Sequence, residues 1–184
     1  MDKQDFWTII DAVHAESGGD LDRKCTLLEM RLHSLADDEI IDFIDHFDAA
    51  DAAAYTWPLW GAAYIMHGGC SDDAFIDFRA TLIAQGQDIY EGALADPDSL
   101  ADLDVDNEEQ ICYEGFQYLA GEVANKKSID LPQRAFRLPD NPTGTAWDEE
   151  ELESLFPRLW AKYCIRADQD DKGPPRKPWW QFWP

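Results

Sequence analysis

Apolar side chains recur three and four residues apart through the first third of the chain, a spacing that places them on one face of an α-helix. Three such stripes follow one another, separated by Gly18-Gly19 and by Ser34–Asp37. We expect the first helix to follow Asp5, the second to be capped by Asp20, and the third to begin with Asp37-Asp38-Glu39. The predicted inward faces consist of Phe6, Ile9, Ile10 and Val13; of Leu21, Cys25, Leu28, Leu32 and Leu35; and of Ile40, Ile41, Ile44 and Phe47.

A more apolar segment occupies the middle of the chain. We expect a short connection over Asp48–Asp51 and then a fourth helix over Ala52–Met66. This helix is apolar almost all round, which is typical of a central, buried helix. Pro58 lies inside it, so the helix either kinks there or begins there with Pro58 in its first turn. Gly68-Gly69 ends the segment.

The helical pattern continues beyond this break. Ser71 is placed to cap a fifth helix that ends at Gly86, and a short helix is expected over Asp88–Leu94. Asp96–Leu100 reads as a turn, and residues 107–124 as a last amphipathic helix. No run of alternating apolar and polar residues is long enough for a strand. The sequence therefore predicts an all-α, compact bundle of six or seven helices with short connections.

The pattern changes from Lys126 onward. Residues 128–147 contain prolines and arginines without a helical period, which predicts an extended arm on the body or reaching past it. One short extra helix is expected after Asp148, interrupted at Pro157. The predicted parts are an acidic all-α domain over 1–125, an extended arm with a short helix packing on the body over 126–171, and a basic Pro/Trp-rich tail over 172–184.

The charge is distributed just as unevenly. The chain has 38 acidic and 15 basic residues, a formal net charge of −23. Residues 1–125 hold 28 of the acidic and five of the basic residues, whereas residues 126–184 hold ten of each. A surface this acidic repels nucleic acids and anionic membranes and attracts basic partners or cations. The same surplus would also serve solubility alone, or a salty cytoplasm.

Composition narrows the class of protein. A 45% hydrophobic content is enough for one sizeable core, and no stretch approaches the roughly 20 apolar residues of a membrane helix. The first residues are acidic and amphipathic, without a visible secretory signal. The four cysteines lie far apart with no CxxC pair, which favours reduced thiols and a cytoplasmic protein. They are Cys25, Cys70, Cys112 and Cys164.

One combination of residues resembles a known family. The sequence Gly68-Gly69-Cys70-Ser71-Asp72-Asp73 is followed closely by Phe78-Arg79. Further matching positions are Phe6-Trp7, Trp57, Trp60, Ala62-Ala63-Tyr64, Phe75, Leu82-Ile83, Gly86 and Asp96-Pro97-Asp98-Ser99-Leu100. On these residues the chain resembles, over roughly residues 1–125, the uncharacterised bacterial family called domain of unknown function 4240. Thr81 stands where that family commonly has Trp. The resemblance implies no substrate or catalytic residue.

The same region provides the candidate ligand pocket of this sequence. Its members are Trp57, Trp60, His67, Cys70, Asp72, Asp73 and Arg79. Each also has a structural interpretation: the two tryptophans, three apart on one helix face, suit the core, and the two aspartates suit a helix start. Arg79 suits an ion pair with one of those aspartates or with a carboxylate of a neighbouring helix. Cys70 suits packing, because nearby carboxylates raise a thiol pKa.

Established catalytic motifs are missing from the sequence. It contains no Gly-rich nucleotide loop and no HExxH, and His67 with Cys70 forms only half of a zinc motif. An acidic run from Asp102 lacks the Gly and Glu of a calcium loop. We therefore predict no catalytic residue, no metal site and no cofactor.

The tail forms a second candidate interaction segment. Its aromatic and basic side chains suit a lipid headgroup layer or an acidic groove of a partner, or fold back onto the acidic body. They are Arg176, Lys177, Trp179, Trp180, Phe182 and Trp183.

These observations predict a non-catalytic acidic interaction protein that binds a basic macromolecular partner, as an immunity-like or regulatory inhibitor would. The alternative is an enzyme or small-ligand binder that uses a pocket near Trp57, Trp60, His67, Cys70 and Arg79. Direct nucleic-acid binding is not expected, and membrane contact is expected only through the tail.

Overall fold

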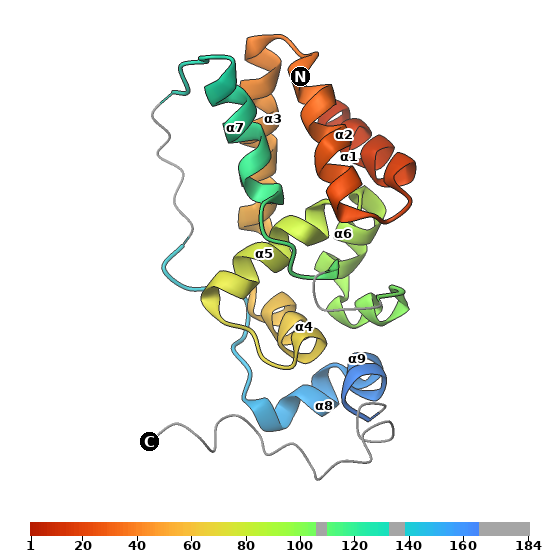
Figure 1. The fold of residues 1–184 in the computed structure, drawn as a ribbon. Coiled ribbons are helices and arrows are strands. Elements are labelled where there is room, and N and C mark those ends of the chain that lie inside the picture. Colours follow the sequence, from red (N-terminus) through yellow and green to blue (C-terminus); the bar gives the residue numbers. More distant parts are fainter. Residues whose placement is uncertain (106–109, 133–138, 166–184) are drawn as a thin grey trace.

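The computed structural model describes residues 1–105, 110–132 and 139–165, and this part of the chain is all-α, which confirms the predicted fold class (Figure 1). The α-helices are α1 (Lys3–Ser17), α2 (Leu21–His33), α3 (Asp37–Ala53), α4 (Trp57–His67), α5 (Asp72–Ile83), α6 (Gln87–Ala95), α7 (Leu119–Lys126), α8 (Leu152–Leu155) and α9 (Pro157–Trp160). Short 3-10 segments are η1 (Pro97–Asp102), η3 (Phe116–Tyr118) and η4 (Glu149–Glu151), and a π-helical turn, η5, covers Ala161–Ile165.

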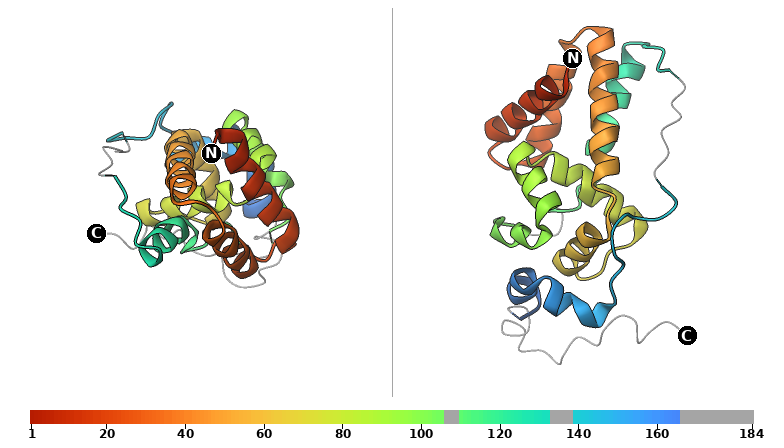
Figure 2. Two further views of the ribbon diagram at one scale, coloured as in Figure 1. Left: turned by 90° about the horizontal axis from the view of Figure 1, so that it is seen from above. Right: turned by 180° about the vertical axis from the view of Figure 1, so that it is seen from behind.

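The helices form three tiers along the long axis of the molecule. Helices α1, α2, α3 and α7 make up one end, α5 and α6 cross the middle, and α4 lies with α8 and α9 at the other end (Figures 1 and 2). The C-terminal segment, residues 139–165, therefore lies far from α7, which precedes it in the sequence. It is joined to the body at Thr143, which bonds with the backbone on either side of Thr56: Trp57 N–H donates to Thr143 O (2.8 Å) and Thr143 N–H to Tyr55 O (3.0 Å).

Most predicted helix boundaries are confirmed. Asp20 and Ser71 cap α2 and α5 through their side-chain oxygens. Pro58 lies in the first turn of α4, whose cap is Thr56, so the helix begins there and does not kink. The start of α1 was placed wrongly, because Asp2 is its cap and Asp5 lies inside the first turn, where the two residues form a reciprocal capping box.

Two predicted elements are wrong. Asp48–Asp51 is not a connection but the last full turn of α3, where Ala50 is buried and Asp51 faces the inside of the fold. Within 107–124, the helices given for the described residues, η3 and α7, lie near the end, and residues 111–115 are not helical. Two features prevent a helix over the residues before Phe116. The backbone N–H of Tyr113 donates to the Thr81 hydroxyl (2.9 Å), and Gly115 has a φ of 118°, which a right-handed helix does not permit.

The C-terminal segment completes the hydrophobic core. Leu152 and Leu159 are fully buried, and Phe156 is 5% exposed. Phe156 lies directly on Gly61 of α4, since a Cβ atom at Gly61 would be 2.7 Å from the Phe156 ring. The Trp147 indole N–H donates to Trp57 O (2.8 Å). Helix α4 is apolar all round because the body covers one side and the C-terminal segment covers the other.

A buried carboxylate of the body caps α9. Asp98 in η1 is 7% exposed and accepts the backbone N–H of Arg158 (3.1 Å) and that of Leu159 (2.9 Å). These are first-turn donors of α9, so Asp98 caps this helix from a distant part of the chain. The Arg158 guanidinium also pairs with Asp102.

Replacing Asp98, the cap of α9, should therefore destabilise the C-terminal segment. Asp98→Ala is expected to lower the free energy of unfolding by about 1–3 kcal/mol, since the α9 donors lose their acceptor. Hydrogen exchange should accelerate at Arg158 and Leu159, while the amides of α1 stay protected. The exposed Asp130→Ala serves as the control; equal exchange at α9 in both variants would contradict the capping role.

Candidate functional site

Arg79 is the most constrained member of the predicted pocket. Its side chain is 1% exposed and pairs with Asp51 of α3 through two bonds, Nε to Oδ1 (2.9 Å) and Nη2 to Oδ2 (3.0 Å). Of the two partners expected for Arg79, the structure shows the carboxylate of a neighbouring helix, Asp51, and not Asp72 or Asp73. A bidentate pair of this kind satisfies the planar guanidinium on one edge.

Two aromatic rings that contact each other, Tyr55 and Phe75, pack against this guanidinium. Tyr55 and Phe75 each lie with their ring centroid 4.9 Å from the Arg79 Cζ atom. The stack continues outward, with Trp60 on Phe75 (4.8 Å between centroids) and Trp57 on Trp60 (5.5 Å). Cation–π contacts stabilise a guanidinium that has lost its water. The tryptophans and Arg79 therefore form a packed joint between α3, α4 and α5.

The loop between α4 and α5 closes over this joint. The Trp60 indole N–H donates to Cys70 O (3.1 Å), and His67 Nδ1 lies 2.7 Å from Gly69 O. Burial raises the pKa of the Cys70 thiol to about 12, although the charge of Arg79 acts in the opposite direction. Asp72 and Asp73 are exposed at the start of α5. The structure thus brings Trp57, Trp60, Cys70 and Arg79 together and leaves the two aspartates facing solvent.

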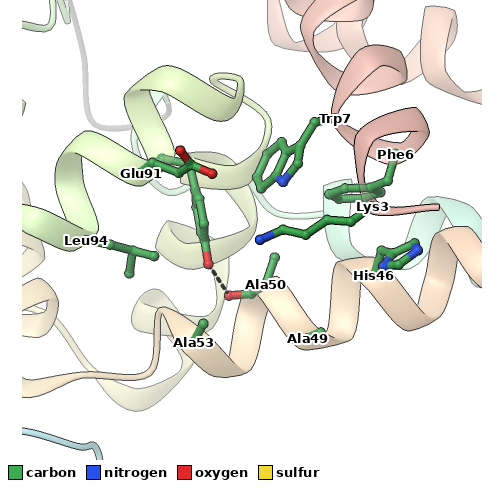
Figure 3. A pocket seen from close by; sticks show the side chains of 10 residues that line it. Lys3, Phe6, Trp7, His46, Ala49, Ala50, Ala53, Glu91 and Leu94 are labelled. Atoms are coloured by element: carbon green, nitrogen blue, oxygen red, sulfur yellow. Dashed lines mark hydrogen bonds between the residues drawn. The ribbon is translucent and has the colours of Figure 1, made fainter.

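Several cavities lie away from this joint, among them two that are lined in part by ionisable side chains. One, of about 540 Å³, is lined by His14, Gln85, Asp104 and other residues near the start of α2. Another, of about 270 Å³, lies between α1, α3 and α6 (Figure 3). Neither includes a member of the predicted pocket in its lining.

A buried lysine is a feature that the sequence analysis missed. Lys24 is fully buried in α2, where its ammonium group donates to the Gln85 side chain (3.1 Å). Among the described residues it has no ion-pair partner, and burial lowers its pKa to about 8. Its position three residues after Leu21 and four before Leu28, within the apolar stripe, was the available signal.

Carboxylates gather where α1 and α3 begin. We call Asp2, Asp5, Asp37, Asp38, Glu39 and Asp42 the acidic end. The Met1 ammonium pairs with Asp42, and this hydrogen bond, with the charges of Glu39 and Asp5 nearby, raises the pKa of the ammonium group. Lys127 after α7 lies 3.3 Å from Asp37, which stays 68% exposed. Helices α1 and α3 begin at the same end of the molecule (Figure 1), so the carboxylates at their starts lie near one another around Met1.

Other site types find little support in the described residues. His, Cys, Asp and Glu side chains there form no group of three or more that could hold a metal ion. The cysteines of the described residues are not joined in disulfide bonds. None of the described helices is both long and apolar enough to cross a membrane. The predicted tail residues Arg176, Lys177, Trp179, Trp180, Phe182 and Trp183 lie outside the described part of the chain.

Comparison with known proteins gives a family but no activity. The family described as "Protein of unknown function (DUF4240)" matches residues 1–126. The chain belongs to this family, which confirms the resemblance seen in the sequence. No curated protein and no solved structure gave a match. The matched residues include the aromatic joint, the acidic end and the 270 Å³ cavity, and end before the C-terminal segment.

The ion pair at the joint should dominate the stability of this region. Asp51→Asn is expected to lower the free energy of unfolding by about 2–4 kcal/mol, because Arg79 would remain buried without a negative partner. Urea unfolding followed by circular dichroism measures this loss. The control, Asp73→Asn, removes a charge that only faces solvent and should cost less than about 1 kcal/mol; similar losses would contradict the assigned pairing.

The raised pKa of Cys70 makes a second expectation testable. Because the thiol stays protonated at neutral pH, iodoacetamide should alkylate Cys70 at least about a hundredfold more slowly than a peptide cysteine. The rate should rise with pH as the thiolate fraction grows, without levelling off below a pH of about 12, and unfolding in urea should remove the protection. Mass spectrometry of the peptide that contains Cys70 follows the reaction. Alkylation of the folded protein at the peptide rate would mean that the thiolate is accessible.

Proposed function

We propose that this member of the DUF4240 family is a non-catalytic, cytoplasmic interaction protein, and that its acidic end binds a basic macromolecular partner. The observation that carries the proposal is that the carboxylates at two helix starts lie near one another around Met1. Six carboxylates lie there, and the ion pairs described for them involve only the Met1 ammonium and Lys127. The remaining negative charge is available to a partner.

The interior of the protein supports the same choice. Arg79 is committed to Asp51, and the pKa of Cys70 keeps its thiol protonated. The groups that an enzyme near Trp57 and Trp60 would use are therefore engaged in packing. The proposal accordingly places function on the surface charge and not at the aromatic joint.

A negatively charged surface of this kind affects how fast a basic partner binds. Clustered charge raises the rate at which an oppositely charged protein arrives, and this advantage falls as salt increases. A basic toxin or nucleic-acid-binding enzyme presents a surface made for phosphates, and carboxylates on rigid helix starts can occupy it. The proposed activity is inhibition by occupation of such a surface.

The experiment compares two matched pairs of substitutions. Asp37→Asn/Asp38→Asn neutralises the start of α3 within the acidic end, and Asp72→Asn/Asp73→Asn neutralises the start of α5 outside it. Basic proteins captured from a lysate of the source cells are identified and purified, and their binding to the full chain is measured at low and high salt. We expect the first pair to weaken binding about fivefold or more, chiefly through slower association.

The control pair should leave the dissociation constant within about twofold, because distant charges are screened beyond the Debye length of about 8 Å. Equal weakening by both pairs would indicate general attraction to net charge and contradict a docking surface at the acidic end. Binding that salt does not change would contradict the electrostatic mechanism altogether.

A further inference from the structure

The cavity between α1, α3 and α6 has the form of a binding pocket for a small flat molecule. Aromatic rings of Phe6, Trp7 and Tyr90 form one part of its wall, and Ala49, Ala50 and Ala53 of α3 form an apolar floor with no long side chain (Figure 3). Lys3, His46 and Glu91 supply its polar groups, and Leu94 completes the lining. A volume of about 270 Å³ suits a ligand of about ten non-hydrogen atoms.

A buried polar atom without a partner marks this pocket. Trp7 is 1% exposed, and its indole nitrogen finds no hydrogen-bond acceptor among the described residues. In Figure 3 the nitrogen-bearing edge of the ring is turned toward the pocket, on the side of Lys3. By contrast, the Tyr90 hydroxyl in the same wall donates to Ala50 O (2.8 Å). A buried N–H group without an acceptor is costly, so an acceptor supplied from outside would be favoured there.

The polar side chains of the pocket indicate which functional groups a ligand would carry. The Trp7 indole and the Lys3 ammonium can only donate, so both require a ligand oxygen or ring nitrogen. The Glu91 carboxylate, on the opposite side of the pocket, can accept from a ligand N–H group. A molecule with a carbonyl oxygen and an amide nitrogen on one ring satisfies donors and acceptor together.

Charge decides between ligands of the same shape. The acidic end lies beside the pocket, because His46 Nε2 is 3.4 Å from Met1 O and the Met1 ammonium pairs with Asp42. An anionic ligand would be repelled by these carboxylates, while a simple ammonium ligand offers no acceptor to the indole. An uncharged ligand avoids both penalties.

We propose that the pocket between α1, α3 and α6 binds an uncharged aromatic ligand with a carboxamide-type carbonyl group, whose oxygen accepts from the Trp7 indole N–H. Lys3 extends across the pocket in Figure 3 and is exposed. Its flexible side chain moves aside to admit the ligand, because the indole nitrogen itself has almost no contact with solvent. This inference is independent of the proposed function, which concerns protein binding at the acidic end.

Benzamide, benzoate and benzylamine test the inference, because they share one ring and differ in charge and acceptor. The readout is the indole N–H signal of Trp7 in a nitrogen–proton correlation spectrum of the full chain, assigned by its loss in Trp7→Phe. Benzamide should shift this signal downfield with a dissociation constant on the order of 1 mM, usual for so small a ligand. Benzoate and benzylamine should bind at least about fivefold more weakly.

Two variants separate the indole N–H from the shape of the pocket, with binding followed by calorimetry and by saturation transfer to the benzamide protons. Trp7→Phe keeps a ring but removes the donor and should weaken benzamide about five- to tenfold. Ala53→Leu fills the pocket from an exposed position and should abolish binding, whereas Ala15→Leu, exposed on α1 outside the pocket, should not change it.

Two results would overturn the inference. The first is an indole signal that stays unmoved by benzamide at about 10 mM, well above the expected dissociation constant. The second is binding that does not depend on the indole donor, seen either as equal affinity for all three probes or as equal affinity of the protein and Trp7→Phe for benzamide. Because these probes are small and the acidic end is unchanged in every variant, neither result would bear on the protein-binding proposal.

Discussion

The buried pair of Arg79 and Asp51 is the interaction on which the rest of this fold depends. Removing a guanidinium and a carboxylate from water is costly, and the cost is offset only where geometry and surroundings are favourable. Here both bonds of the bidentate pair are made, and the neighbouring rings of Tyr55 and Phe75 pack against the guanidinium. The pair fixes the last turn of α3 against α5, and the aromatic stack that begins at Phe75 then positions α4.

The far side of α4 is fixed by chain that lies outside the family match. Residues 139–165 place Phe156 on Gly61 and direct the Trp147 indole to the backbone of α4. Asp98 holds α9 in place by accepting its first backbone donors. A helix that is apolar all round needs cover on every side, so the C-terminal segment is part of the same core as the body to which it is joined.

Charge is used in two different ways in this protein. The interior charges are constrained: Arg79 has a full partner, and burial lowers the pKa of Lys24, whose ammonium group donates to the Gln85 amide oxygen. The exterior charges are numerous and concentrate at helix starts, where they stabilise the helices and also leave a negative surface. Recognition of a basic protein would use the exterior, whereas a small uncharged ligand would use the pocket beside Trp7, where an unpaired donor is sheltered from water.

Sequence alone determined what depends on neighbouring residues: the helical class and the caps at Asp20 and Ser71, since apolar period and capping act within a few positions. At Pro58 it left a kink and a helix start open, and the structure shows the start. Sequence alone failed where contacts join distant residues. Asp48–Asp51 looks like a polar connection until Arg79, 28 positions beyond Asp51, is seen to need its carboxylate. Nothing local indicates that the Trp7 indole lacks an acceptor, that α1 and α3 begin side by side, or that Asp98 caps α9. Only the tertiary structure decided these features, because each arises from groups that meet in space after the chain has folded.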